Sequence, residues 1–136
     1  MTAKSYLEQL SKLDKNIQDT LYEIYRLRTI ASSTATYNMN GDRVQTSFNS
    51  DKIGDIVTRI VELEEEADRL TDKFADLKTD IYMKLNLLER YRHKEILRKK
   101  YIENKSIYTI AYELGMSDRG CKKAHKRALE EFEKIL

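Results

Sequence analysis

Two long stretches of the chain place apolar residues at alternating steps of three and four. The first covers residues 3–31, with Thr20 as its only polar member: Ala3, Tyr6, Leu10, Leu13, Ile17, Thr20, Ile24, Leu27 and Ala31. The second covers residues 53–81: Ile53, Ile56, Ile60, Leu63, Ala67, Leu70, Phe74, Leu77 and Ile81. This heptad pattern arises when one helix lies along another. It predicts an all-α fold that begins with a long antiparallel helical hairpin over residues 1–88.

Residues 32–50, between the two stretches, show no such period. Their sequence, SSTATYNMNGDRVQTSFNS, is rich in Ser, Thr and Asn, and the Asn-Gly-Asp at 40–42 is typical of a turn. We therefore expect a loop over residues 32–50, with Ser50 or Asp51 capping the second helix. The loop is either a connection at the tip of the hairpin or a segment that binds a partner.

A hairpin of two helices buries little apolar surface by itself, and folds with small cores are only marginally stable. In the first helix, Leu7, Leu21 and Tyr25 widen the apolar stripe beyond a strict heptad seam, so further helices are expected to pack there. Tyr22 and the flanking leucines therefore predict that hairpins pair into a four-helix arrangement, which gives a homodimer or a higher homo-oligomer.

Residues 89–136 form a second predicted domain, made of short helices. Ser106 is placed to cap a helix that ends at Gly115, and Ser117 is placed to cap the last helix after a very short turn. Small and apolar residues then recur at the spacing of a helix-turn-helix core: Ile110, Ala111, Leu114, Gly115, Met116, Cys121 and Ala124. This pattern predicts a DNA-binding helix-turn-helix.

The last helix separates its charges in two ways. Around the helix, the basic residues lie opposite Cys121, and along it they come before Glu130, Glu131 and Glu133. The helix dipole favours the reverse order by about 0.3–1 kcal/mol per charge, whereas contact of the first half with phosphates or base edges explains the observed order. We predict that the following residues bind DNA: Arg119, Lys122, Lys123, Lys126 and Arg127, together with Ser106 and Ser117. Arg119 is the candidate for a base edge, and the lysines for phosphates.

The net charge of the whole chain is +2, but the charge is unevenly distributed. Residues 1–88 carry 12 Lys and Arg against 15 Asp and Glu, a net charge of −3, whereas residues 89–136 carry 13 against 8, a net charge of +5. A polyanionic partner is therefore expected for the C-terminal third only. With no Pro in the sequence, long helices meet no obligatory break.

Other classes of function are disfavoured. No apolar run approaches the ~18–20 residues of a membrane span, and the N-terminus lacks the apolar segment of a secretory signal. A single cysteine fits a cytoplasmic protein. We see no nucleophile–base pair, phosphate loop or metal-ligand cluster, so we expect no enzyme, cofactor, metal or small-molecule substrate. His93 has no evident companion, while His125 and Cys121 lie on the apolar side of the last helix and are expected in the core.

Residues 87–136 resemble region 4 of bacterial sigma factors, whose helix-turn-helix binds the −35 promoter element. The resemblance is carried by LRKKYIENKSIYTIAYELGMS and by RAL at 127–129. Nearly the whole chain is similar to phage and prophage proteins of the ArpU/RinA type, which are late transcription regulators. The motifs behind this second resemblance are YLEQL, LDKNI, GDRVQTS, DKIGDIV, IVELE, MSDRG and H-x-RAL. Gly120 and Cys121 depart from the sigma pattern, and no segment resembles the sigma region that melts promoter DNA.

The resemblance implies a transcription regulator of phage or prophage genes that binds double-stranded DNA as a dimer through its last helix. Two alternatives stay open. In one, the sigma-like domain is a protein-interaction module that binds RNA polymerase or a sigma factor. In the other, the chain is the DNA-recognition subunit of a phage terminase, for which a ring of many subunits is expected.

Overall fold

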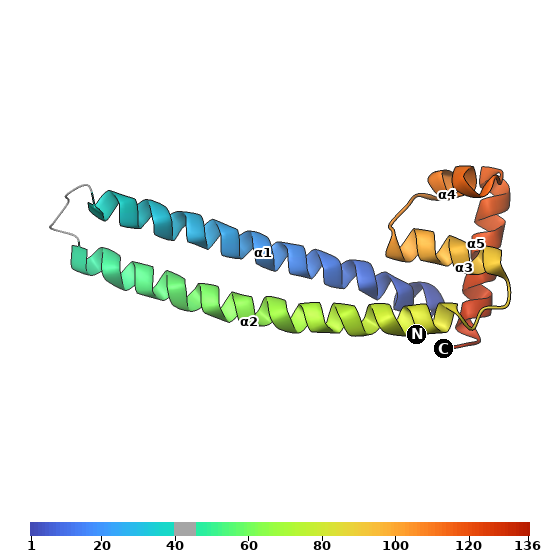
Figure 1. Cartoon of the computed structure of the whole chain (residues 1–136), viewed down its shortest axis with the longest axis horizontal. Coiled ribbons are helices and arrows are strands. Elements are labelled where there is room, and N and C mark those ends of the chain that lie inside the picture. Colours follow the sequence, from blue (N-terminus) through green and yellow to red (C-terminus); the bar gives the residue numbers. More distant parts are fainter. Residues whose placement is uncertain (40–45) are drawn as a thin grey trace. The chain divides into compact units, whose positions relative to one another are not determined.

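The computed structural model of the chain is built from helices (Figure 1). It describes the backbone of residues 1–39 and 46–136 and the side chains of residues 1–33 and 51–136. The helices are α1 (Ala3–Met39), α2 (Thr46–Leu85), α3 (Tyr91–Leu97), the π-helix η2 (Arg98–Ile102), α4 (Ile107–Leu114) and α5 (Asp118–Glu133). The described residues contain no strand, which confirms the all-α prediction. None of these helices is long and apolar enough to cross a bilayer.

The predicted loop over residues 32–50 is too long at both ends. The first helix continues to Met39 and the second begins at Thr46, so neither Ser50 nor Asp51 is its N-cap. The reason is that residues 32–39 and 46–50 contain neither Pro nor Gly, and Ser, Thr and Asn lower helix stability only by tenths of a kcal/mol each. The centre of the predicted loop, residues 40–45, lies outside the described residues.

The chain forms two compact units, and each unit contains one segment of α1 and one segment of α2. Unit 1 consists of Met1–Asp14 and Lys73–Leu136, and unit 2 of Lys15–Asp72. The sequence-based division at residue 88 was drawn from charge and period, and as a functional division it stays a prediction.

Unit 2 is an antiparallel pair of helix segments, which run side by side in Figure 1. Its buried cluster takes Ile24 and Leu27 from α1 and Ile60, Leu63 and Ala67 from α2. These residues belong to the predicted heptad positions on both helices. An ion pair between Arg28 and Glu64 links the helices beside this cluster. The heptad pattern therefore predicted this packing correctly.

Unit 1 has a core to which both ends of the hairpin contribute. The start of α1 supplies Ala3, Leu7 and Leu10, and the end of α2 supplies Ile81 and Leu85. The C-terminal helices complete this core with Leu97, Tyr101, Ala128 and Phe132. The rings of Tyr6 and Phe132 lie 6.0 Å apart, which ties the first turn of α1 directly to α5. The C-terminal helices thus pack on the start of α1 and the end of α2.

A second core in unit 1 holds the three C-terminal helices together. Its fully buried members are Ile96 from α3, Ile110 and Ala111 from α4, and Cys121 from α5. Around them pack Ile107, Leu114, Met116 and Ala124. Six of the seven residues that the sequence singled out for a helix-turn-helix core belong to this cluster, and the seventh, Gly115, forms the turn. The prediction of this core is confirmed.

Candidate nucleic-acid interface

The turn between α4 and α5 has the backbone geometry expected from its sequence. Gly115 ends α4 in the left-handed conformation, with φ at 66° and ψ at 34°. The amide of Met116 donates to the carbonyl of Ala111 at 2.8 Å, and that of Gly115 donates to Tyr112 at 3.2 Å, which is a Schellman-type helix end. A Cβ at residue 115 would meet no atom within 4 Å. The positive φ of residue 115, and not a lack of space, therefore favours glycine at this position.

Both predicted serine caps are present. The hydroxyl of Ser106 accepts from the backbone N–H of Thr109 at 3.2 Å, and the hydroxyl of Ser117 accepts from that of Gly120 at 3.0 Å. Each cap satisfies an amide that the first turn of a helix leaves without a partner. These contacts define where α4 and α5 begin. Binding of DNA by the same two serines stays a prediction.

Gly120 departs from the sigma pattern for a reason that is visible at this cap. A Cβ at residue 120 would lie 2.9 Å from the Ser117 hydroxyl oxygen, closer than such atoms approach. Glycine therefore leaves room for the cap, although it lowers intrinsic helix stability by up to about 1 kcal/mol. The unusual residue is explained by local packing at the start of α5.

Replacing Ser117 with Ala should lower the free energy of unfolding by about 1 kcal/mol, because the Gly120 amide loses its acceptor. Urea denaturation followed by circular dichroism measures this change. The double variant Ser117→Ala, Gly120→Ala is the matched control. It should recover most of the loss, since the better helix former no longer meets the hydroxyl. Equal stability of Ser117→Ala and the wild type would show that the cap contributes nothing.

Five cations lie on the exposed face of α5: Arg119, Lys122, Lys123, Lys126 and Arg127. Among the described residues, none of the five forms an ion pair within 4.0 Å. We call this set the basic face of α5. The structure therefore brings together all five of the predicted basic residues.

Three other cations in the same unit, Arg98, Lys99 and Lys105, form ion pairs with glutamates. Glu113 of α4 pairs with both Lys99 and Lys105 at 2.7 Å, and these bonds hold the pKa of its carboxyl below the usual value. Arg98 of η2 pairs with Glu95 at 2.6 Å and with Glu103 at 3.4 Å. These three cations, unlike the five on α5, are therefore held by carboxylates of their own unit.

Tyr108 extends the basic face onto α4. The ammonium of Lys122 lies 5.3 Å from the centre of the Tyr108 ring, within range of a cation–π contact. Tyr108 is exposed, as is Tyr112 one turn further along α4, which is 88% accessible. Neither tyrosine was predicted from the sequence, because Tyr108 lies beside Lys122 only through the packing of α4 against α5, which local sequence patterns do not give.

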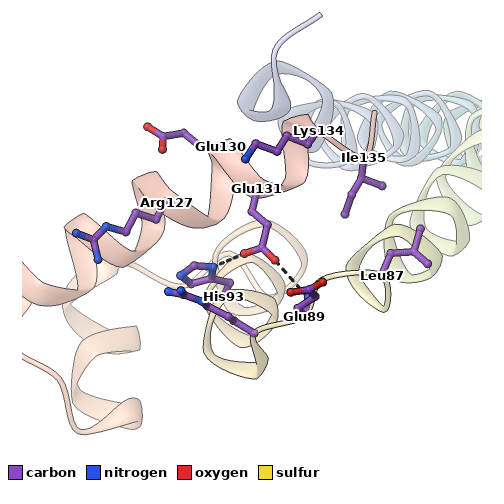
Figure 2. Close-up of a pocket in the computed structure, with 9 residues that line it drawn as sticks. Leu87, Glu89, His93, Arg127, Glu130, Glu131, Lys134 and Ile135 are labelled. Atoms are coloured by element: carbon purple, nitrogen blue, oxygen red, sulfur yellow. Dashed lines mark hydrogen bonds and ion pairs between the residues drawn. The ribbon is translucent and has the colours of Figure 1, made fainter.

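His93 was expected to have no companion, and this expectation was wrong. It is only 6% exposed, and its Nδ1 lies 2.6 Å from Oε2 of Glu131 on α5. The other carboxylate oxygen of Glu131 accepts from the backbone amide of Glu89 at 3.2 Å. Figure 2 shows Glu131 between these two partners, at the edge of a hollow of about 470 Å³. The hydrogen bond with His93 is the main cause that lowers the pKa of Glu131.

His125 lies on the apolar side of α5, as predicted, and contacts η2. Its Nε2 is 2.9 Å from the hydroxyl of Tyr101, and the two rings stack with centres 5.7 Å apart. Burial is the main cause that lowers the pKa of His125 to about 4, and the charges of Lys100 and Lys4 contribute to the same shift. Burial likewise raises the pKa of Tyr101 to about 12. At neutral pH, the tyrosine therefore donates this hydrogen bond to a neutral imidazole.

These contacts hold α5 against α3 and η2. Glu131 and His125 fix two sides of α5 to α3 and η2, so the cations on the third side are presented from a rigid helix. Cys121 is fully buried, and burial raises the pKa of its thiol, which fits a core residue. Among the described side chains, no three His, Cys, Asp or Glu groups gather as a metal-binding set.

Residues 31–133 match the model of a family described as protein of unknown function (DUF1492). The chain belongs to this family. The match includes α3, η2, α4 and the five residues of the basic face. No curated protein and no solved structure matches the chain significantly.

Proposed function

We propose that this DUF1492 protein is a sequence-specific regulator of transcription that binds double-stranded DNA through the basic face of α5. The observation that carries the proposal is this set of five exposed cations, which form no ion pair with the described residues and lie within the first ten residues of α5. They lie above a helix-turn-helix core and run against the helix dipole, so helix stability does not account for them. A polyanion that docks on α5 accounts for the position of these cations.

In this proposal α5 enters the major groove. We assign Arg119, in the first turn of α5, a bidentate contact with a guanine edge, and the lysines that follow contacts with phosphates. Lys122, held against Tyr108, has its ammonium directed along the junction of α4 and α5. The resemblance to ArpU/RinA-type proteins and to sigma region 4 supports phage or prophage promoters as the target.

Selection of random double-stranded DNA by the full chain tests this function. We expect an enriched motif with two half-sites spaced by whole helical turns, about 10–10.5 bp each, because the proposed regulator binds as a dimer. Affinity for that motif should fall with salt at a logarithmic slope of roughly −5 to −9, about 0.9 for each phosphate contacted. Failure to enrich any motif, or affinity that does not change with salt, would contradict the proposal.

One observation favours a second function, the binding of RNA polymerase or a sigma factor. Tyr112 is 88% exposed on α4, and Tyr91 is 73% exposed at the start of α3. Exposed tyrosines are enriched in protein interfaces. Co-sedimentation of the chain with RNA polymerase, lost on Tyr112→Ala and present without any DNA binding, would favour this alternative over the first.

A further inference from the structure

Unit 1 contains a second hollow, of about 280 Å³, to which the start of α1, the region of η2 and the middle of α5 contribute. Six of the seven residues that line it have side chains able to donate a hydrogen bond: Lys4, Ser11, Lys100, Tyr101, Asn104 and His125. None of them belongs to the basic face of α5 or lines the hollow beside His93. We call this cavity the Lys4–Lys100 hollow.

Two ammonium groups from different elements act on one imidazole in this hollow. Lys4 lies in the first turn of α1 and Lys100 lies in η2. Both positive charges contribute to the low pKa of His125, after burial, so both ammonium groups are within electrostatic reach of the ring. The ring is neutral at pH 7 and carries no charge of its own. The fold thus gathers positive charge around a group that cannot compensate it.

Carboxylates in the hollow offset this charge only weakly. Of the seven lining residues, Glu8 is the only carboxylate, and it lies 4.0 Å from the ammonium of Lys4. Exposed pairs at such a distance are weak because water screens both charges. Among the described residues, Lys100 forms no ion pair within 4.0 Å. Both ammonium groups are therefore available to an anion from outside.

The hydrogen bond at the bottom of the hollow also favours an acceptor. Tyr101 donates to Nε2 of His125 at 2.9 Å, so the proton of the neutral imidazole is on Nδ1. The hollow therefore offers two ammonium groups and an imidazole N–H, with the hydroxyl of Ser11 and the amide of Asn104 beside them. A phosphate dianion has only acceptor oxygens, and charge-assisted bonds from such donors are the strong ones.

The size and depth of the hollow indicate a small ligand. Its volume is close to the lower limit of about 300 Å³ for ligand pockets. It ends at the ring of Tyr101, which is only 6% exposed. A small molecule can enter such a recess, whereas a phosphate in the backbone of a duplex is flanked by bulky sugars.

We propose that the Lys4–Lys100 hollow binds a small molecule through a phosphate group, which lies between the ammonium groups of Lys4 and Lys100 and accepts from Nδ1 of His125. The site goes beyond the proposed function, because it uses no residue of the basic face of α5. It therefore stands or falls independently of DNA binding.

Titration of the labelled full chain with inorganic phosphate, followed by NMR at constant ionic strength, tests this site. The ring signals of His125 should shift and saturate, with a Kd on the order of 1 mM. The variant Lys4→Gln, Lys100→Gln should bind phosphate at least about tenfold more weakly. The matched control Lys12→Gln, Lys73→Gln removes the same charge from exposed residues of unit 1 that do not line the hollow, and it should bind like the wild type.

Glu8→Gln supplies a change of opposite sign. It removes the carboxylate from the hollow, so phosphate should bind about threefold more tightly. Circular dichroism checks the fold of each variant, and Glu8→Gln decides the question if the double lysine variant unfolds. The inference is overturned by a wild type that shows no saturation, by equal losses in the two lysine variants, or by a Glu8→Gln variant that binds no more tightly.

The DNA backbone is the other source of phosphate, and a binding assay with the selected duplex separates it from a small molecule. Lys4→Gln, Lys100→Gln should keep its affinity for DNA within about threefold, because only long-range attraction is reduced. A tenfold loss would make the hollow part of the DNA contact and overturn the inference. Saturable phosphate binding by a chain that selects no DNA motif would refute the proposed function alone.

Discussion

Replacement of Arg119, Lys122 and Lys126 together with Ala is expected to weaken DNA binding by about a hundredfold or more at physiological salt. Each of the three is exposed on α5 and lacks an ion-pair partner, so its charge is available to the duplex. A phosphate contact and a base contact each contribute on the order of 1 kcal/mol, and the base contact more. The logarithmic salt slope should also become shallower, by about one for each phosphate that the variant no longer neutralises. Fluorescence anisotropy over a salt series measures both quantities.

The control for this variant removes the same net charge elsewhere. Lys12, Lys15 and Lys73 are exposed residues of α1 and α2, and their replacement with Ala lowers the net charge by the same three units. We expect this control to reduce the affinity by less than about threefold, because only long-range attraction is weakened. If both triple variants bind DNA equally well, the basic face of α5 is not the contact surface.

Acidification from pH 7 to pH 4 is expected to destabilise the fold by roughly 2–3 kcal/mol through His125 alone. Burial holds its pKa near 4 in the folded chain, against 6.5 for an ordinary histidine. Between pH 6.5 and pH 4, His125 is therefore protonated in the unfolded chain but stays neutral in the folded chain. The contribution of His125 to the free energy of unfolding is complete above pH 6.5 and is lost as the pH falls toward 4. Below pH 4 this residue causes no further loss. Urea titrations at several pH values measure it.

Two variants separate the causes of this pH dependence. His125→Gln keeps an amide oxygen that can accept from Tyr101 but does not titrate, so the loss between pH 7 and 4 should shrink by roughly 2 kcal/mol. Tyr101→Phe removes the hydrogen bond and should cost about 1 kcal/mol at neutral pH. It should keep most of the pH dependence, because burial is the main cause of the pKa shift. A wild type and a His125→Gln variant with identical pH profiles would disprove this account.

The parts of the fold that the sequence predicted are those decided by local rules. The heptad steps placed Ile24 and Leu63 in one seam because a helix repeats every 3.6 residues. Gly115 and Ser117 were identifiable because turns and caps select residues by backbone conformation and by a short hydroxyl. The basic face of α5 was visible for the same reason, since one helical period groups its cations without knowledge of any neighbour.

The missed features depend on packing between distant segments. His93 and Glu131 are 38 residues apart, and their contact exists only because α3 lies against α5. The π-helix η2 gives no clear sequence signal, although it places Tyr101 against His125. Helix ends were also misplaced around residues 32–50, where the apolar period stops before the helices do. Periodicity reports contact with a partner helix, and a helix can extend beyond its partner.

The joint core of unit 1 has a consequence for the order in which the chain folds during its synthesis. Tyr6 and Leu7 leave the ribosome more than a hundred residues before Phe132, with which they pack. At about 5–20 residues per second, several seconds separate the two. During that interval a translating ribosome carries the start of α1 without its partners on α5, and the core of unit 1 is completed only after residue 132 emerges.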